Sequence, residues 1–246
     1  SGHLAIFQYY FEEEPPILFD VILHLGSLFV ILYILRNEIK DFLSFMPSAL
    51  KKVNDRSNLR EEEKIVFLVI LASIPTAIIG LFLEGTIIVT FYDNMHLVGT
   101  CLIITGAVIW FSKDYNDNLS FDNLSSSNAF FVGIIQGLSI LPGLSRSGLT
   151  IAFLRFFGLN PIKAARFSFL IFIPAIIGAT FLKINEVSDT IEEVGLFSII
   201  LGSSASVISS FLSIKFLLKL LNNRKFHYFT PYCLVIGSVL IFESLI

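Results

Sequence analysis

The sequence is poor in charge. Only 15% of its 246 residues are Asp, Glu, Lys or Arg, whereas a soluble domain carries about a quarter. Hydrophobic residues make up 54%, and the mean hydropathy is +0.79. The net charge of −3 argues against a nucleic-acid partner. This composition excludes an ordinary soluble domain and indicates an integral membrane protein.

Cysteine is scarce as well. The two cysteines, Cys101 and Cys233, both lie inside apolar runs, so we expect no disulfide framework and no reactive thiol. The sequence also has no Walker loop, no zinc-ligand spacing and no dinucleotide-binding glycine pattern. Nothing in it therefore points to nucleotide chemistry or to a structural zinc.

Long apolar runs, by contrast, are abundant. A helix rises about 1.5 Å per residue and a bilayer core is about 30 Å thick, so about 20 apolar residues can cross it. A polar segment from Arg36 to Lys64 reads as a loop, with a short amphipathic surface helix as an alternative. The sequence predicts an all-α integral membrane protein, with residues 1–246 as a single membrane domain. The candidate spans, of which the third and sixth are short, are Ile17–Leu35, Ile65–Leu83, Leu97–Phe111, Ala164–Leu182, Leu196–Leu221 and Tyr232–Ile246.

Lysine and arginine are distributed unevenly around these spans. If the first span runs from outside to inside, then of the 17 Lys and Arg residues only Arg146 and Lys183 fall outside the cytoplasmic segments. Cytoplasmic loops carry an excess of such residues. We therefore predict that Ser1 and Ile246 both lie on the external side.

Two shorter apolar runs flank a polar motif. The runs Ala129–Leu141 and Leu149–Phe157 would form helices about 20 Å and about 14 Å long, too short to span a bilayer singly. Pro142 should end the first helix, and Gly143 permits a tight turn. We predict a re-entrant hairpin with its polar tip at membrane depth.

The tip has the composition of an anion site. A charge at membrane depth costs about 2.5–3.5 kcal/mol, so Arg146 marks a functional position. The hydroxyls of Ser145, Ser147 and Thr150 and the amides of the second helix surround it in sequence. This donor set suits phosphate best. The alternative is a solvated turn with a snorkelling arginine.

The spans also suggest an inverted repeat. Each half, residues 1–112 and 129–246, would contain a re-entrant hairpin followed by three spans, and an odd number of spans inverts the second half. The two hairpin tips could then meet near the midplane, which would place His3 close to Arg146. Short sequence echoes accompany this pattern: residues 74–80 resemble residues 173–178, and residues 1–3 resemble residues 147–149.

Histidine can act as an acid, a base or a nucleophile at a phosphoryl group, and His3 is the candidate here. His24 lies one helical turn after Asp20, and we expect that neighbour to satisfy it rather than a catalytic role. We expect His96 and His227 to be surface residues near span ends.

The motif itself resembles a known family. Gln136-Gly137 and then Pro142-Gly143-Leu144-Ser145-Arg146-Ser147-Gly148-Leu149-Thr150 resemble a signature of the undecaprenyl-diphosphate phosphatase family of the bacitracin-resistance type. The stretches Ser1-Gly2-His3-Leu4 and Phe19–Gly26 resemble two further segments of that family. The resemblance extends over essentially the whole chain. It also implies that the sequence begins within the first signature, N-terminally truncated, without the acidic pair that precedes it in the family.

The resemblance implies a hydrolase that releases phosphate from undecaprenyl diphosphate, a wall-precursor lipid carrier, in the bacterial plasma membrane, with its site open to the external side. It implies catalytic roles for His3, Ser145, Arg146 and Thr150. Substrate-binding roles fall to Ser1, Gln136, Gly143, Ser147 and Gly148. The resemblance implies that a divalent cation, Mg²⁺ or Ca²⁺, assists, although the sequence shows no complete ligand set. A homodimer is one option for the assembly.

A secondary transporter or lipid flippase is the alternative, because inverted repeats with broken helices are common in transporters. Ion coupling usually needs an acidic residue near the midplane. The acidic residues associated with these spans sit near their ends instead: Asp20, Glu84, Glu186 and Glu243.

Overall fold

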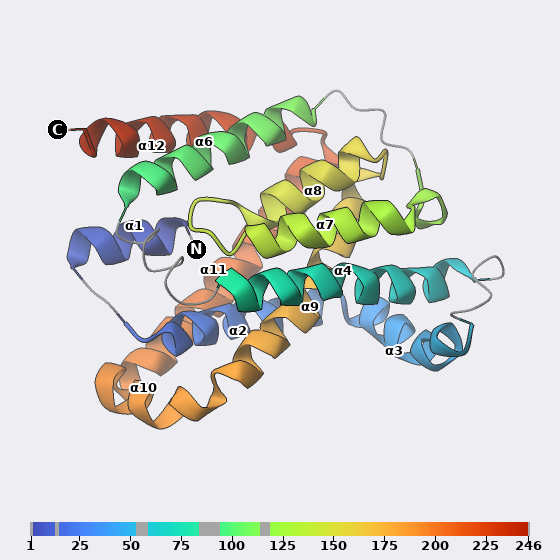
Figure 1. Ribbon diagram of the computed structural model, residues 1–246, viewed down its shortest axis with the longest axis horizontal. Coiled ribbons are helices and arrows are strands. Elements are labelled where there is room, and N and C mark those ends of the chain that lie inside the picture. The colour runs from blue at the N-terminus through green and yellow to red at the C-terminus, as the bar shows by residue number, and fades with distance from the viewer. Residues whose placement is uncertain (1, 13–14, 53–58, 84–93, 114–118, 246) are drawn as a thin grey trace.

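The computed structural model describes residues 2–12, 15–52, 59–83, 94–113 and 119–245 (Figure 1). These residues form helices and connecting turns, with one isolated bridge between Leu119 and Leu159 as their only β-pairing. The all-α prediction is therefore confirmed. The helices are α1 (Gly2–Phe11), α2 (Ile17–Ile34), α3 (Arg36–Lys51), α4 (Glu61–Leu83), α6 (Met95–Phe111), α7 (Ser126–Leu138), α8 (Arg146–Phe156), α9 (Pro161–Leu182), α10 (Val187–Val194), α11 (Leu196–Asn222) and α12 (Phe229–Glu243).

Five of the helical segments are long and apolar enough to cross a membrane: α2, α4, α9, α11 and the segment Phe226–Glu243 that contains α12. The apolar α6 has 17 residues and a length of about 25 Å. These six helices coincide with the six predicted spans. Their outer faces carry large exposed apolar side chains, such as Phe82 at 81% and Phe197 at 78%. Such surfaces are stable against lipid and not against water, so the protein is a multi-pass membrane protein.

The helices pack in pairs drawn from the two halves of the chain. In Figure 1, α6 runs along α12 and α4 runs along α7, while α2 packs against α11 and α9 packs against α4. In the predicted repeat, the three spans of the first half (α2, α4 and α6) correspond in order to the three spans of the second half (α9, α11 and α12). Under this correspondence, the contact between α2 and α11 is equivalent to the contact between α9 and α4. The α6–α12 pair maps onto itself. This pattern agrees with two related halves, whose inverted orientation stays a prediction.

The sequence echo between residues 74–80 and 173–178 does not follow this correspondence. The first segment lies in α4, the second span of its half, whereas the second lies in α9, the first span of its half. Both segments place a proline inside an apolar helix, at Pro75 and Pro174. The echo therefore reflects similar composition and not equivalent position, and its interpretation as part of the repeat is wrong.

Close approach of α4 and α7 holds the first arm of the hairpin in place. A Cβ atom on Gly133 would lie 2.1 Å from the carbonyl oxygen of Ala72, so only glycine fits there. Thr76 Oγ1, in the next turn of α4, donates to the Gly133 carbonyl oxygen over 2.8 Å. Small residues allow this approach, and the buried hydroxyl adds a bond that lipid cannot supply.

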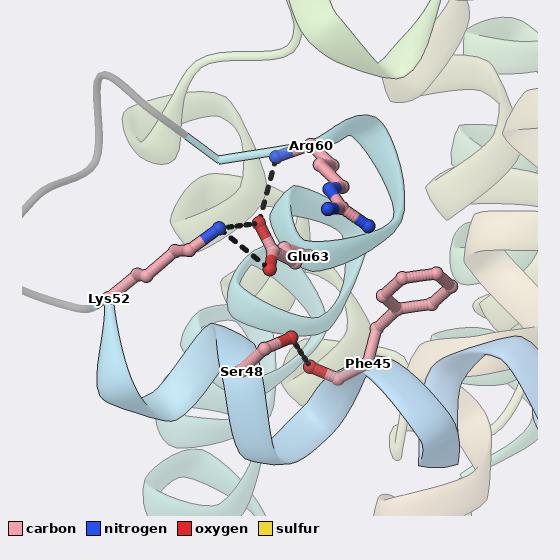
Figure 2. Close-up of polar contacts among 5 residues, drawn as sticks. All are labelled: Phe45, Ser48, Lys52, Arg60 and Glu63. Atoms are coloured by element: carbon pink, nitrogen blue, oxygen red, sulfur yellow. Dashed lines mark hydrogen bonds and ion pairs between the residues drawn. The ribbon is translucent and has the colours of Figure 1, made fainter.

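The polar segment between the first two spans contains the 16-residue helix α3, so the surface-helix alternative is confirmed. The following span also begins earlier than predicted, at Glu61 instead of Ile65. Figure 2 shows the reason: Glu63, only 2% exposed, accepts bonds from Lys52 Nζ at 2.9 and 3.0 Å and from the Arg60 amide at 3.0 Å. A carboxylate is favourable in the first turn of a helix, where amides lack partners.

Candidate functional site

The predicted hairpin consists of α7, the turn 139–145 and α8. The first helix ends at Leu138 and not at Leu141, so the predicted boundary is three residues too late. Ser139 Oγ donates back to the Ile135 carbonyl oxygen at 2.7 Å. Pro142 disfavours helical geometry at the residue before it. Neither helix of the hairpin is long enough to cross a bilayer, as the sequence predicts.

The turn is fastened to α6. Gly143 has φ +92°, and a Cβ atom there would lie 2.4 Å from the Val98 carbonyl oxygen. The fully buried Thr105 donates to the Gly143 carbonyl oxygen at 3.1 Å and accepts from the Ser145 amide at 3.1 Å. One hydroxyl thus fixes both the backbone turn and the residue that starts α8. Sequence reasoning missed Thr105, because nothing local links it to a turn 38 residues away.

Ser145 caps α8. Its Oγ accepts from the Gly148 amide at 3.2 Å, which leaves the hydroxyl proton available to another acceptor. A Cβ atom on Gly148 would lie 2.8 Å from that Oγ, so glycine is required for the cap. Ser147 is half-buried in the same turn. The cap leaves the first amides of α8 directed toward the tip of the hairpin.

Arg146 is the first residue of α8, at the positive end of the helix dipole. Its guanidinium carbon lies 3.6 Å from the centroid of the Phe172 ring in α9. Its Nη1 is buried and has no hydrogen-bond partner among the described residues, and no acidic side chain of that part of the chain forms an ion pair with it. The helix dipole and the arginine therefore both favour an anion at this point.

Thr150 has no exposed surface. Its Oγ1 donates to the Arg146 carbonyl oxygen at 2.8 Å and lies 2.6 Å from Ser168 Oγ of α9. These bonds hold α8 against α9 and occupy the hydroxyl. Its position favours support of the Arg146 backbone, and direct contact with a ligand stays a prediction.

Gln136 lies where α4, α7 and α9 meet. The side chain is 5% exposed, and its Nε2 donates to the Ile171 carbonyl oxygen at 3.0 Å and to Thr76 Oγ1 at 3.3 Å. Its Oε1 has no partner within the described residues. The contacts given for Gln136 join helices, and substrate binding by this side chain stays a prediction.

The first motif meets the second through glycine. A Cβ atom on Gly2 would lie 3.1 Å from both the Cα and the nitrogen of Gly143, so the start of α1 adjoins the hairpin turn. The exposed ring of His3 stacks on Tyr232 of α12, with centroids 5.6 Å apart, and its Nε2 forms a hydrogen bond with the Tyr232 hydroxyl. The structure thus brings the two motifs together at their backbones, while the His3 ring faces α12. Ser1 lies outside the described residues.

His24 belongs to the surroundings of Arg146, which sequence reasoning did not anticipate. Its ring packs edge-on against Phe172, with centroids 6.4 Å apart, so His24 and Arg146 share one aromatic ring. The carboxylate of Asp20, one turn earlier, accepts from Gln8 Nε2 at 3.2 Å. A histidine in the middle of an apolar span was the available signal.

The described residues do not offer a ready metal site. No group of three or more His, Cys, Asp or Glu side chains among them is arranged to hold an ion. The divalent cation that the resemblance implies therefore stays a prediction.

The fold and the site together define a multi-pass α-helical membrane protein that presents a partly buried arginine at the tip of a broken helical hairpin. The chain belongs to the family described as bacitracin resistance protein BacA, whose family model matches residues 1–239.

Curated relatives agree with this assignment. The chain is 35% identical to the undecaprenyl-diphosphatase of Desulfosudis oleivorans, over 97% of this chain and 89% of that protein. It is 34% identical to the undecaprenyl-diphosphatases of Alkaliphilus metalliredigens and Methanobrevibacter smithii, over 100% of this chain and 92% and 90% of those proteins.

Proposed function

We propose that this protein is an undecaprenyl-diphosphate phosphatase that recycles the cell-wall lipid carrier and so contributes to bacitracin resistance. Family membership and the names of its relatives support the reaction. The observation that carries the proposal to particular atoms is Arg146, a cation at the positive end of a helix, whose buried Nη1 lacks a hydrogen-bond partner among the described residues. A phosphate group would satisfy both the arginine and the helix amides.

The net reaction adds one water across the bridging phosphorus–oxygen bond and yields undecaprenyl phosphate and inorganic phosphate. The lipid tail stays in the bilayer while the diphosphate enters at the hairpin tip. Arg146, the free proton of Ser145 and the backbone amides of Arg146 and Ser147 at the start of α8 bind the oxygens of the transferred phosphoryl group. Gly148 supports them by donating its own amide to the Ser145 cap. Because they are held in place before the reaction, they stabilise its charge without reorganising.

His3 would act as the acid or base. Its Nε2 is hydrogen-bonded to the Tyr232 hydroxyl, so Tyr232 is in a position to orient the ring, as the third member of a catalytic triad orients its base. The adjoining backbones of Gly2 and Gly143 support this role, because they bring the start of α1 next to the hairpin turn. Gln136 and Thr150 support the same hairpin through their bonds with α9.

The site opens on the external side of the plasma membrane in this proposal. Figure 1 places α3 at one end of the molecule, and α10 and the end of α12 at the other. The α3 end holds Lys40, Lys52 and Lys163, the kind of residues that stay in the cytoplasm. In intact cells, Ser44→Cys on α3 should resist an impermeant thiol reagent. Rapid labelling would reverse the orientation.

A phosphate-release assay tests the activity. The purified protein in lipid nanodiscs should release inorganic phosphate from undecaprenyl diphosphate, and sealed vesicles should release it without accumulating a solute. Solute accumulation without phosphate release would instead favour a transporter. Repeating the assay with a chelator and with added Mg²⁺ or Ca²⁺ tests the divalent cation, and the mass of the protein in nanodiscs tests the homodimer.

A further inference from the structure

The outer face of α3 is arranged in ordered stripes. Successive residues turn by about 100° around a helix, so residues 43 and 50 form one ridge. Leu43 and Leu50 are 59% and 55% exposed. The next ridge holds three exposed cations, Arg36, Lys40 and Lys51. Small and polar residues follow on the far side. The face therefore passes from apolar to basic to polar, as the surface of a helix at a membrane interface does.

The opposite face of α3 is fixed to the protein. Ile39 and Phe42 pack against the hydrophobic core. The C-terminal end of α3 is tied to α4 by the bond from Lys52 to Glu63 (Figure 2), and its N-terminal part is tied to α9 by the ion pair of Glu38 and Arg166 at 3.3 Å. The outer face consequently has a fixed orientation relative to the spans.

These contacts also leave acidic and basic side chains on different faces. Glu38 and Glu63 are directed inward to cations, whereas Arg36, Lys40 and Lys51 are exposed. Asp41 is the exposed acidic residue of this helix. The outer face of α3 therefore has an excess of positive charge beside two exposed leucines.

The depth of this face follows from α2. Only Leu35 separates the end of α2 at Ile34 from Arg36, so α3 begins where a membrane span ends. That level is the layer of lipid headgroups. Three cations there would meet phosphate oxygens, while Leu43 and Leu50 would reach the boundary with the acyl chains.

We propose that the outer face of α3 binds the headgroups of anionic phospholipids in the cytoplasmic leaflet. The binding is independent of the phosphatase reaction and uses none of its residues. Each basic residue near an anionic surface contributes a factor of about five to association, so three should enrich anionic lipid clearly around α3.

Local quenching tests the proposal. A fluorophore on Ser44→Cys, beside the basic ridge, reports the lipids around α3, and Cys101 and Cys233 are buried and should stay unlabelled. The full chain is placed in phosphatidylcholine nanodiscs that contain a small fraction of spin-labelled phosphatidylglycerol or, in parallel, spin-labelled phosphatidylcholine. Quenching by phosphatidylglycerol should exceed quenching by phosphatidylcholine at least fivefold and should fall as salt rises.

Matched variants locate the effect. Arg36→Gln, Lys40→Gln and Lys51→Gln combined should bring the two lipids to equal quenching, whereas the charge-conserving set Arg36→Lys, Lys40→Arg and Lys51→Arg should keep the preference. Neutralising Lys215, Lys219 and Lys225 removes the same charge elsewhere and should leave it unchanged. Three results would overturn the proposal. The two lipids could quench equally in the parent protein, or both neutralised sets could lose the preference equally. The third result is no quenching by either lipid, as a protein partner covering α3 would give.

Discussion

Arg146 and Glu63 are both charged side chains in the first turn of a helix, and their surroundings are opposite. Glu63 suits the positive end of α4 and is saturated by Lys52 and the Arg60 amide. Arg146 opposes the dipole of α8, and its buried Nη1 has no partner in the described part of the chain. The first arrangement stabilises the fold by itself. The second becomes favourable only when an anion arrives, so it indicates a binding site.

The largest effect is expected at Arg146. Arg146→Lys keeps the charge and loses the two-pronged geometry, so phosphate release should fall about 10- to 150-fold, the value of one charge-assisted hydrogen bond at the transition state. The melting temperature should change little, because lysine also places a cation near the Phe172 ring and Arg146 Nη1 has no hydrogen-bond partner to lose among the described residues. Turnover close to that of the parent would show that Arg146 is structural.

Thr105 should come next, because it positions the turn without touching the substrate. Thr105→Val leaves the Gly143 carbonyl and the Ser145 amide without their shared partner, so the start of α8 can shift. Misplacement by about 1 Å can cost about 100-fold, and we expect a loss of 10- to 100-fold in kcat. Thr105→Ser keeps the hydroxyl and should restore most of the rate. If serine is no better than valine, the hydroxyl does not fix the turn.

Phe172 supports Arg146 through its ring face. A desolvated cation–π contact is worth about 2 kcal/mol, so Phe172→Leu should weaken substrate binding by up to about 30-fold. Phe169→Leu on the same helix is the control, because Phe169 is similarly buried and no cation of the described residues lies on its ring. A KM that rises equally in both variants would indicate general loosening of α9.

Glu63 should show the reverse behaviour, with no effect on the rate. Glu63→Gln weakens the link between α3 and α4, and the melting temperature should drop by about 2–4 °C, as expected for a domain that loses one ordinary hydrogen bond. The rate of phosphate release per folded molecule should not change. Glu62→Gln, its exposed neighbour, should alter neither quantity. A slower reaction in Glu63→Gln would show that the contact between α3 and α4 affects activity as well as stability.

The spans and the hairpin could be predicted from the sequence because lipid imposes a simple rule on apolar length. Arg146 was recognisable for the same reason, as a charge in an apolar setting. The helix α3 was only an alternative, because charges and Pro47 interrupt its pattern and its stability comes from contacts with α4 and α9.

The supports of the site were beyond sequence reasoning. The bond from Thr105 to Gly143, the ring that Phe172 shares with Arg146 and His24, and the pairing of His3 with Tyr232 all join residues far apart in the chain. No local pattern specifies such contacts. The echo between α4 and α9 shows the opposite error, since similar composition suggested an equivalence that the packing does not have.

Titration calorimetry with inorganic pyrophosphate tests the central claim most directly, because it measures anion binding without the reaction. The parent protein should bind pyrophosphate, Arg146→Lys should bind it at least tenfold more weakly, and Glu63→Gln should bind it like the parent. Equal affinity in the parent and in Arg146→Lys would contradict the claim that the guanidinium of Arg146 is where the diphosphate binds.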